Sequence, residues 1–180
     1  MQTYIALLRG INVSGQKKII MAELREHLKQ LDFSDIQTYI QSGNIVFKFK
    51  KISPSKLETM ITELLKREYD FQVPCIIRSK KEIENIISNN PFKEQAAENF
   101  KSLYFVLLKN PPKKEQLKSL ESIDYPNEYF EFNKNHVYLY LPNGAGRAKL
   151  NNNFFEKKLE VNASTRNLRT LIKLIELASK

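Results

Sequence analysis

The chain of 180 residues has few of the side chains from which metal sites and nucleophilic active sites are built, with one cysteine, two histidines and no tryptophan. The single cysteine, Cys75, excludes an intramolecular disulfide, and its apolar neighbours indicate a small buried core residue rather than a nucleophile. His27 and His136 are too few for a histidine-rich metal cluster, and neither belongs to a nucleophile-elbow motif. We therefore expect no metal and no cofactor, and no group of residues demands an enzyme.

Long apolar runs are also missing. The longest clean run, residues 103–108, is far shorter than the roughly 20 residues that cross a bilayer. The start, Met1-Gln2-Thr3, leads directly into a strand-like segment and lacks the basic and apolar parts of a secretory signal. With 42% hydrophobic residues the chain can still form a sizeable core. We expect a folded cytoplasmic protein without membrane contact, and the sequence leaves its oligomeric state open.

Arginine is scarce relative to lysine, because 22 of the 29 basic residues behind the net charge of +9 are lysines. Arginine grips a phosphate with two donors at once, whereas lysine acts as a point charge. We therefore expect nucleic-acid binding to be weak and non-specific, and to be lost between low and physiological salt. One local excess stands out, since residues 147–173 include seven basic side chains and two acidic ones.

Apolar periodicity predicts an α+β fold in which the order βαββαβ occurs twice. In the first repeat we expect strands at 3–9, 35–40, 44–49 and 73–77, with helices at 20–31 and after Pro54. In the second we expect strands at 103–108, 129–132, 136–141 and 161–163, with helices at 113–120, 147–159 and after Ser164 or Thr165. The prediction is two tandem ferredoxin-like units, 1–80 and 102–180, joined by a helical connector at 81–101. The second unit is less regular, because its fourth strand is weak and an extra helix ends the chain.

The expected strand arrangement predicts which loops lie at the same end of each sheet. We expect the first and third strands of each unit to be parallel neighbours, so that the loops after them lie at the same end of the sheet. Residues 9–18 then lie near residues 50–53, and the turn at 41–44 lies at the opposite end. A pocket that contains both Arg9 and Gln41 is therefore not expected within one unit, and would require the seam between the units or a second copy of the chain.

Two glycine-bearing segments follow strand-like runs in the first unit. Arg9-Gly10-Ile11-Asn12 could wrap an anion, because glycine lets a ligand approach the backbone and successive N–H groups form a nest. A structural loop is the alternative. Gln41-Ser42-Gly43-Asn44 is typical of a tight hairpin turn, and a binding turn is the less frequent alternative. The candidate ligand-binding residues here are Arg9, Gly10, Asn12, Gln41, Ser42 and Asn44.

The strongest anion candidate is the segment Gly144-Ala145-Gly146-Arg147-Ala148-Lys149, which we expect to open a helix. The unpaired N–H groups and the dipole of a helix N-terminus favour negative charge, and this segment adds two cationic side chains. Arg166 opens the last predicted helix in the same manner. Helix capping is the alternative explanation for both segments. The candidate residues here are Gly144, Gly146, Arg147, Lys149 and Arg166.

These segments, together with Leu8 to Gly15, Asn90-Pro91-Phe92 and Thr165-Arg166-Asn167, resemble the bacterial family DUF1697, a domain of unknown function, over about residues 4–174. The family usually has a serine where this chain has Ala148, and a tryptophan where it has Leu168. A hydroxyl ligand and an aromatic stacking role are therefore missing at these two positions. The resemblance implies no established reaction, ligand or catalytic residue.

From these observations we expect a cytoplasmic binding module for an anionic partner, either a small molecule with a phosphate or carboxylate group or a nucleic acid. Tyr138 and Tyr140 alternate with apolar residues, as on a sheet face that stacks bases. If the two units pack sheet to sheet, both are interface core instead, and this is the interpretation that we favour. The second hypothesis is an enzyme or small-ligand protein with a polar pocket at the seam, built from residues such as Arg9, Gln41 and Arg147. The third is a structural or oligomerisation protein.

Overall fold

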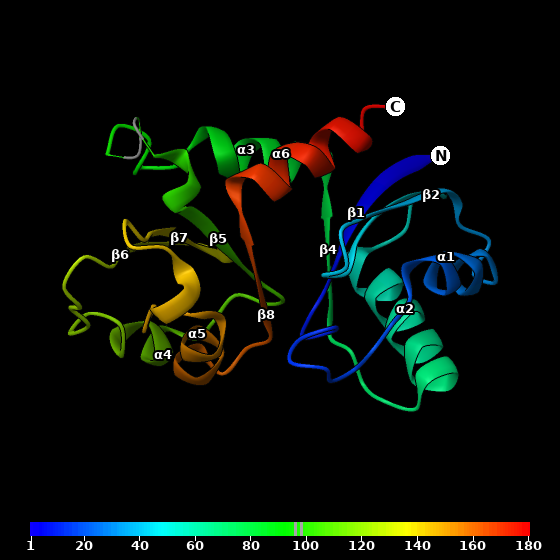
Figure 1. Cartoon of the computed structure of the whole chain (residues 1–180), viewed down its shortest axis with the longest axis horizontal. Coiled ribbons are helices and arrows are strands. Elements are labelled where there is room, and N and C mark those ends of the chain that lie inside the picture. The colour runs from blue at the N-terminus through cyan, green and yellow to red at the C-terminus, as the bar shows by residue number, and fades with distance from the viewer. Residues whose placement is uncertain (96, 98) are drawn as a thin grey trace. The chain divides into compact units, whose positions relative to one another are not determined.

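The computed structural model describes residues 1–95, 97 and 99–180 (Figure 1). The chain divides into two compact parts. Unit 1 comprises Met1–Asn85 together with Ile172–Lys180, and unit 2 comprises Ile86–Leu171. This division differs from the predicted one, because the last nine residues, 172–180, cluster with the first unit rather than the second.

The strands and helices of the described residues follow the predicted order. The N-terminal elements are β1 (Gln2–Leu8), α1 (Met21–Lys29), β2 (Ser34–Tyr39), β3 (Asn44–Phe49), α2 (Pro54–Tyr69), β4 (Cys75–Ser79) and α3 (Lys80–Ser88). The C-terminal elements are β5 (Leu103–Leu108), α4 (Lys114–Lys118), β6 (Tyr129–Asn133), β7 (His136–Tyr140), α5 (Asn152–Leu159), β8 (Ala163–Asn167) and α6 (Leu168–Leu177). Two short 3-10 turns, Phe100–Ser102 and Ala145–Arg147, complete the order. The fold is thus two tandem α+β units with six helices among the described residues.

Each unit contains one four-stranded sheet, in the order β2-β3-β1-β4 in unit 1 and β6-β7-β5-β8 in unit 2. All of the strand pairs are antiparallel, including β1 with β3 and β5 with β7. The expectation that the first and third strands are parallel is therefore wrong. The reason is the hairpin between β2 and β3, which reverses the chain once more after α1 has crossed the sheet. The loop after β1 accordingly lies beside the start of β3.

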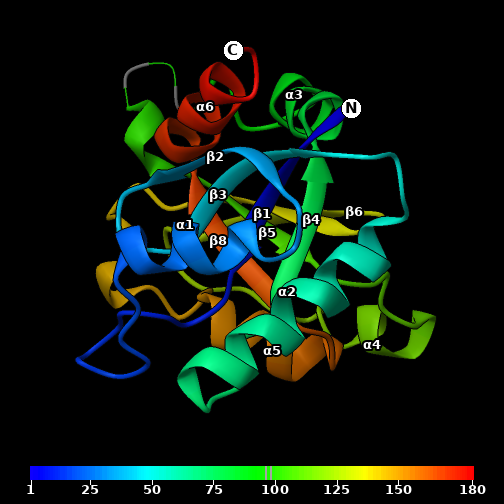
Figure 2. The same ribbon diagram turned by 90° about the vertical axis from the view of Figure 1, so that its right-hand side faces the viewer.

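Helix α2 shows why the local sequence folds as it does. Ser53 is the N-cap residue and its side chain accepts a hydrogen bond from Lys56 N, while Pro54 occupies the first turn, where its missing N–H has no cost. Its apolar stripe lies in the core of unit 1 with residues of the sheet, such as Tyr4 and Phe47. Figure 2 shows α1 and α2 together on one side of this sheet.

Two element boundaries in unit 2 differ from the prediction. Helix α5 begins at Asn152 rather than at 147, because the side chain of Asn151 caps it by accepting a hydrogen bond from Phe154 N at 3.0 Å. Strand β8 is longer than the predicted 161–163 and extends to Asn167, whose side chain caps α6 by accepting from Thr170 N at 2.9 Å. The fourth strand of the second sheet is therefore complete.

Candidate functional site

The loop after β1 and the turn before β3 meet at one end of the unit 1 sheet. Leu8 N donates to the carbonyl of Gly43 at 2.8 Å, and the Asn12 amide nitrogen donates to the carbonyl of Gln41 at 2.8 Å. The expectation that these two segments lie at opposite ends is wrong, as the antiparallel pairing requires. The candidates Arg9, Gly10, Asn12, Gln41, Ser42 and Asn44 therefore lie at one end of a single sheet, and we call residues 9–20 and 39–44 the two-loop junction.

The side chain of Asn12 holds the two-loop junction together. Its amide nitrogen also donates to the carbonyl of Ile19 at 2.9 Å, and its oxygen accepts from Ile19 N at 2.9 Å. Asn12 N donates to the carbonyl of Lys17 at 3.1 Å, and so closes the loop on itself. The amide of Asn12 is thus occupied by backbone groups, and its role is to fix the loop rather than to bind a ligand.

Gly43 and Asn44 serve the turn in the same way. Gly43 has a positive φ of 74°, and a Cβ atom there would lie 2.5 Å from Leu8 Cβ and 2.9 Å from Ile11 Cδ1. Asn44 is buried, and its amide donates to the carbonyl of Tyr39 at 3.1 Å and to the Ser42 hydroxyl at 2.9 Å. Turn geometry accounts for these residues, which is the alternative that the sequence favoured.

Unit 2 contains a hollow of about 510 Å³ around the predicted anion segment. We call it the glycine hollow, and its lining residues are Pro126, Asn127, Glu128, Leu141, Asn143, Gly144, Gly146, Arg147 and Ala148. Arg147 and Gly146 are exposed. A Cβ atom added to Gly144 or to Gly146 would meet no atom within 4 Å. The segment therefore lies in open space beside a cationic side chain.

The geometry of this segment differs from a helix N-terminus. Arg147 ends a 3-10 turn, five residues before α5 begins. The backbone N–H groups of Lys149 and Leu150 donate to the two carboxylate oxygens of Glu128, at 3.0 and 2.7 Å. The ammonium of Lys149 lies 4.8 Å from the centre of the Tyr125 ring. A carboxylate of the protein itself thus occupies the donors that we expected an external anion to use.

Arg166 has a structural environment. It lies in β8 rather than at a helix start, and its Nη1 donates to the Ser164 hydroxyl and to the carbonyl of Thr165, both at 2.9 Å. Arg78 takes the equivalent place in unit 1 and donates to the carbonyl of Ile77 at 2.7 Å. Burial lowers the pKa of Arg78, an effect that nearby carboxylates oppose. Each of these arginines hydrogen-bonds to the carbonyl of the residue before it, and neither lines the glycine hollow.

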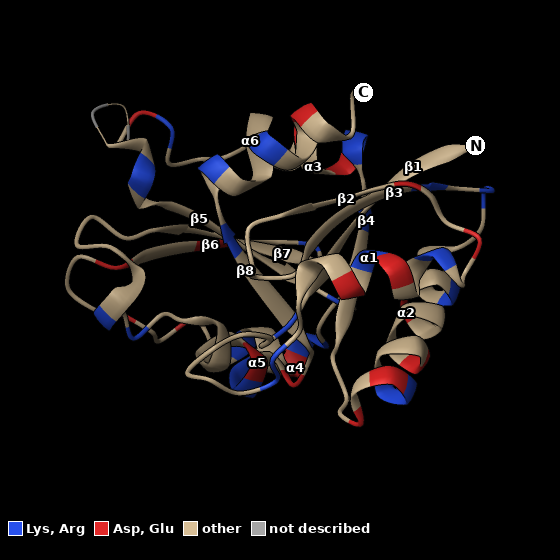
Figure 3. Ribbon diagram, turned by 45° about the vertical axis from the view of Figure 1, so that its right-hand side comes forward, with Lys and Arg blue, Asp and Glu red and all other residues tan. Residues whose placement is uncertain are grey.

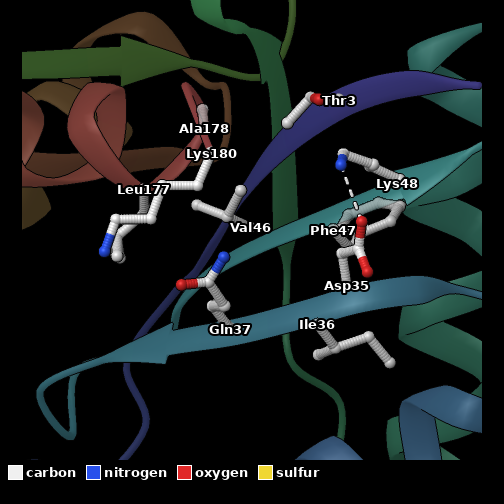
Figure 4. Close-up of a pocket in the computed structure, with 10 residues that line it drawn as sticks. All are labelled: Thr3, Asp35, Ile36, Gln37, Val46, Phe47, Lys48, Leu177, Ala178 and Lys180. Atoms are coloured by element: carbon white, nitrogen blue, oxygen red, sulfur yellow. Dashed lines mark ion pairs between the residues drawn. The ribbon is translucent and has the colours of Figure 1, made fainter.

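A second hollow, of about 370 Å³, lies on the unit 1 sheet and was not predicted (Figure 4). The amide of Gln37 points from β2 toward Val46 and Leu177, while Lys48 and Asp35 form an ion pair at 2.7 Å. The register of β2 shifts between Ser34 and Gln37, which is typical of a β-bulge. The largely polar segment 34–38 is the signal that could have found this hollow. Its lining carries Lys48 and Asp35, which pair with each other, and Lys180.

The tyrosines of β7 do not form an open stacking face. Tyr138 is only 1% exposed, and its ring packs edge-on against Phe105 with centroids 6.0 Å apart. Tyr140 stacks against Phe92 at 6.1 Å and against Tyr129 at 5.8 Å. Basic and acidic residues both occur on α1 and on α2, so neither helix carries charge of only one sign (Figure 3). Of the two interpretations that the sequence left open, the buried ring of Tyr138 excludes an open stacking face at that position.

Among the described residues, no group of three or more His, Cys, Asp or Glu side chains is arranged to hold a metal ion. None of the helices in the described part of the chain combines the length and the apolar character that a membrane span requires.

Comparison with known proteins places the chain in a family. It is similar to the solved structure of the conserved bacterial protein SP0830 from Streptococcus pneumoniae, with 24% sequence identity, a TM-score of 0.75 and 98% of each chain covered. At this identity the likeness shows the fold alone. No curated protein matches the chain. The family described as "Protein of unknown function (DUF1697)" matches residues 1–138, which include the two-loop junction but not Gly144 to Arg147. The chain belongs to the DUF1697 family.

Proposed function

We propose that this protein binds a small anionic molecule in the glycine hollow of unit 2, with Arg147 as the cation that receives the phosphate or carboxylate group. The observation that carries the proposal is Gly146. All five glycines of the chain lie in the described residues, and four of them have a positive φ that disfavours other residues. Gly146 has neither a positive φ nor a crowded Cβ position. Because the backbone does not require a glycine there, close approach of a ligand gives this glycine a purpose.

The groups around the hollow suit a small polar anion. The guanidinium of Arg147 offers paired donors, and the amides of Asn127 and Asn143 lie on the same lining. The volume of about 510 Å³ is within the usual range for small-molecule sites. Glu128 keeps a negative charge on the lining, which two backbone N–H groups partly compensate. We therefore favour a ligand with one phosphate or carboxylate group over a polyphosphate or a nucleic acid.

Finer statements about the fold, the partners and the location accompany this proposal. We assign each unit to the ferredoxin-like plan, because both have the order βαββαβ and matching strand orders. Nucleic-acid binding, if present, is weak and non-specific, since lysine supplies most of the basic charge. The cytoplasmic location and a polar pocket shared by the two units stay predictions from the sequence.

Isothermal titration calorimetry of the full chain at low salt, which measures the affinity for an added anion, tests the proposal. The probes are inorganic phosphate and acetate, and the variants are Arg147→Ala and its control Arg169→Ala, which removes the same charge from an exposed position of unit 2. We expect Arg147→Ala to weaken binding by about tenfold, the effect of one lost charge-assisted hydrogen bond, with no change in stability. Equal affinities of the wild type and Arg147→Ala would contradict the site.

A further inference from the structure

The two-loop junction exposes three branched aliphatic side chains. Val13 is 58% exposed, Ile20 is 59% exposed and Ile40 is 54% exposed. The amide nitrogen of Asn12 donates to the carbonyls of Ile19 and Gln41. Each exposed aliphatic residue is adjacent in sequence to one of these three hydrogen-bonded residues. The three residues therefore lie at the same end of unit 1.

The backbone at two of these positions favours polar residues. Ile20 is the N-cap of α1, with extended backbone and no side-chain cap, where serine, threonine, aspartate or asparagine stabilises a helix. Ile40 has a φ of 48°, in the left-handed region that glycine and asparagine tolerate and that β-branched residues avoid. An exposed isoleucine at either place lowers stability without burying its side chain. Residues that break local rules in this way are expected at functional surfaces.

The two-loop junction is held in one shape. Gln16 N donates to the carbonyl of Val13 at 2.9 Å, which closes a short turn at the tip of the loop after β1. The ammonium of Lys17 donates to the carbonyl of Gln72 at 2.7 Å. This hydrogen bond connects the loop after β1 to the segment between α2 and β4. A surface fixed before binding loses little conformational entropy when a partner docks.

The charged residues of the two-loop junction itself are all basic, and the first acidic residue along the chain is Glu23 in the first turn of α1. Residues 1–22 include Arg9, Lys17 and Lys18 and no aspartate or glutamate. The three exposed side chains are aliphatic, whereas surfaces that insert into membranes favour tryptophan and tyrosine at the interface. Apolar anchors inside a basic rim complement an acidic protein segment with apolar side chains.

We propose that the two-loop junction is a docking surface for an acidic segment of another protein, with Ile20 and Ile40 as its apolar anchors. This surface is separate from the glycine hollow, and neither proposal depends on the other.

The test uses a phage-displayed library of random peptides selected on the immobilised full chain. The selected peptides should carry acidic residues next to apolar ones. Their affinities are then measured by fluorescence anisotropy for the wild type, for the double variant Ile20→Ser with Ile40→Asn, and for the control Phe100→Ser, which removes an exposed aromatic side chain in unit 2. The double variant should bind at least about tenfold more weakly, as expected when central anchors are lost, and the control should bind as the wild type does.

Weaker binding by the double variant would not be due to unfolding, because both substitutions introduce residues that the local backbone prefers. The double variant should therefore melt no lower than the wild type. Selection of no acidic peptide, or equal binding by the double variant, would overturn the proposal. Binding of the wild type but not the double variant to vesicles of phosphatidylserine and phosphatidylcholine would replace the protein partner by a membrane. Self-association of the wild type that the double variant abolishes would replace it by a second copy.

Discussion

Replacing Gly43 by alanine should destabilise unit 1 by about 3 kcal/mol. A non-glycine residue in the left-handed region costs about 1–2 kcal/mol, and overpacking a filled site costs about 1–3 kcal/mol more. Both terms apply at Gly43, where φ is 74° and the new methyl group would lie 2.5 Å from Leu8 Cβ. Leu8 lies in the central strand β1, so its Cβ moves only if the strand moves.

Two glycines of the glycine hollow are matched controls. Gly144 has a φ of 76° but open space around it, so Gly144→Ala should cost only the conformational part, about 1–2 kcal/mol. Gly146 has neither constraint, so Gly146→Ala should change stability by less than about 0.5 kcal/mol. Urea unfolding followed by far-UV circular dichroism gives the free energy of unfolding of each variant. A loss for Gly43→Ala no larger than that for Gly144→Ala would refute the steric reasoning.

Three further predictions concern single side chains. Asn12→Ala removes three side-chain hydrogen bonds, two with Ile19 in the same loop and one to Gln41 in the turn before β3, and should lower the free energy of unfolding by about 2–3 kcal/mol. An unchanged urea midpoint would contradict a stabilising role of the Asn12 side chain. Glu128→Ala frees two backbone N–H groups beside Arg147, so phosphate should bind more tightly in calorimetry, whereas weaker binding would make Glu128 a ligand-binding group. Burial, with a smaller effect of Glu131, raises the pKa of Tyr138, so its contribution to stability is present below about pH 10 and is lost as the pH rises through its folded pKa. Urea midpoints measured from pH 8 to pH 11 should fall less steeply in Tyr138→Phe, and identical slopes would argue against this assignment.

Apolar periodicity predicted the order of the strands and helices because it depends only on near neighbours in the sequence. The position of α5 was missed because glycine and arginine at 144–147 are also typical of a helix start, and only the cap formed by Asn151 decides where the helix begins. The end of β8 was missed for a similar reason. Ser164 and Thr165 are common caps, but their pairing with β5 places them in the sheet.

The candidate site was predictable only in part. The sequence pointed to the segment that lines the glycine hollow, because two glycines next to an arginine are typical of a loop that binds an anion. Glu128 was missed, since it lies 21 residues before Lys149 and no local pattern joins them. The meeting of the loop after β1 with the turn before β3 was missed because we expected β1 and β3 to be parallel, whereas they are antiparallel.

The most direct test of the proposed function is a titration of the uniformly ¹⁵N-labelled full chain with inorganic phosphate, followed by amide chemical shifts in two-dimensional NMR at low salt. We expect saturable shifts, largest at Gly144, Gly146 and Arg147, and their loss in Arg147→Ala but not in Arg169→Ala. Shifts that never saturate, or saturable shifts confined to other residues, would contradict an anion site in the glycine hollow.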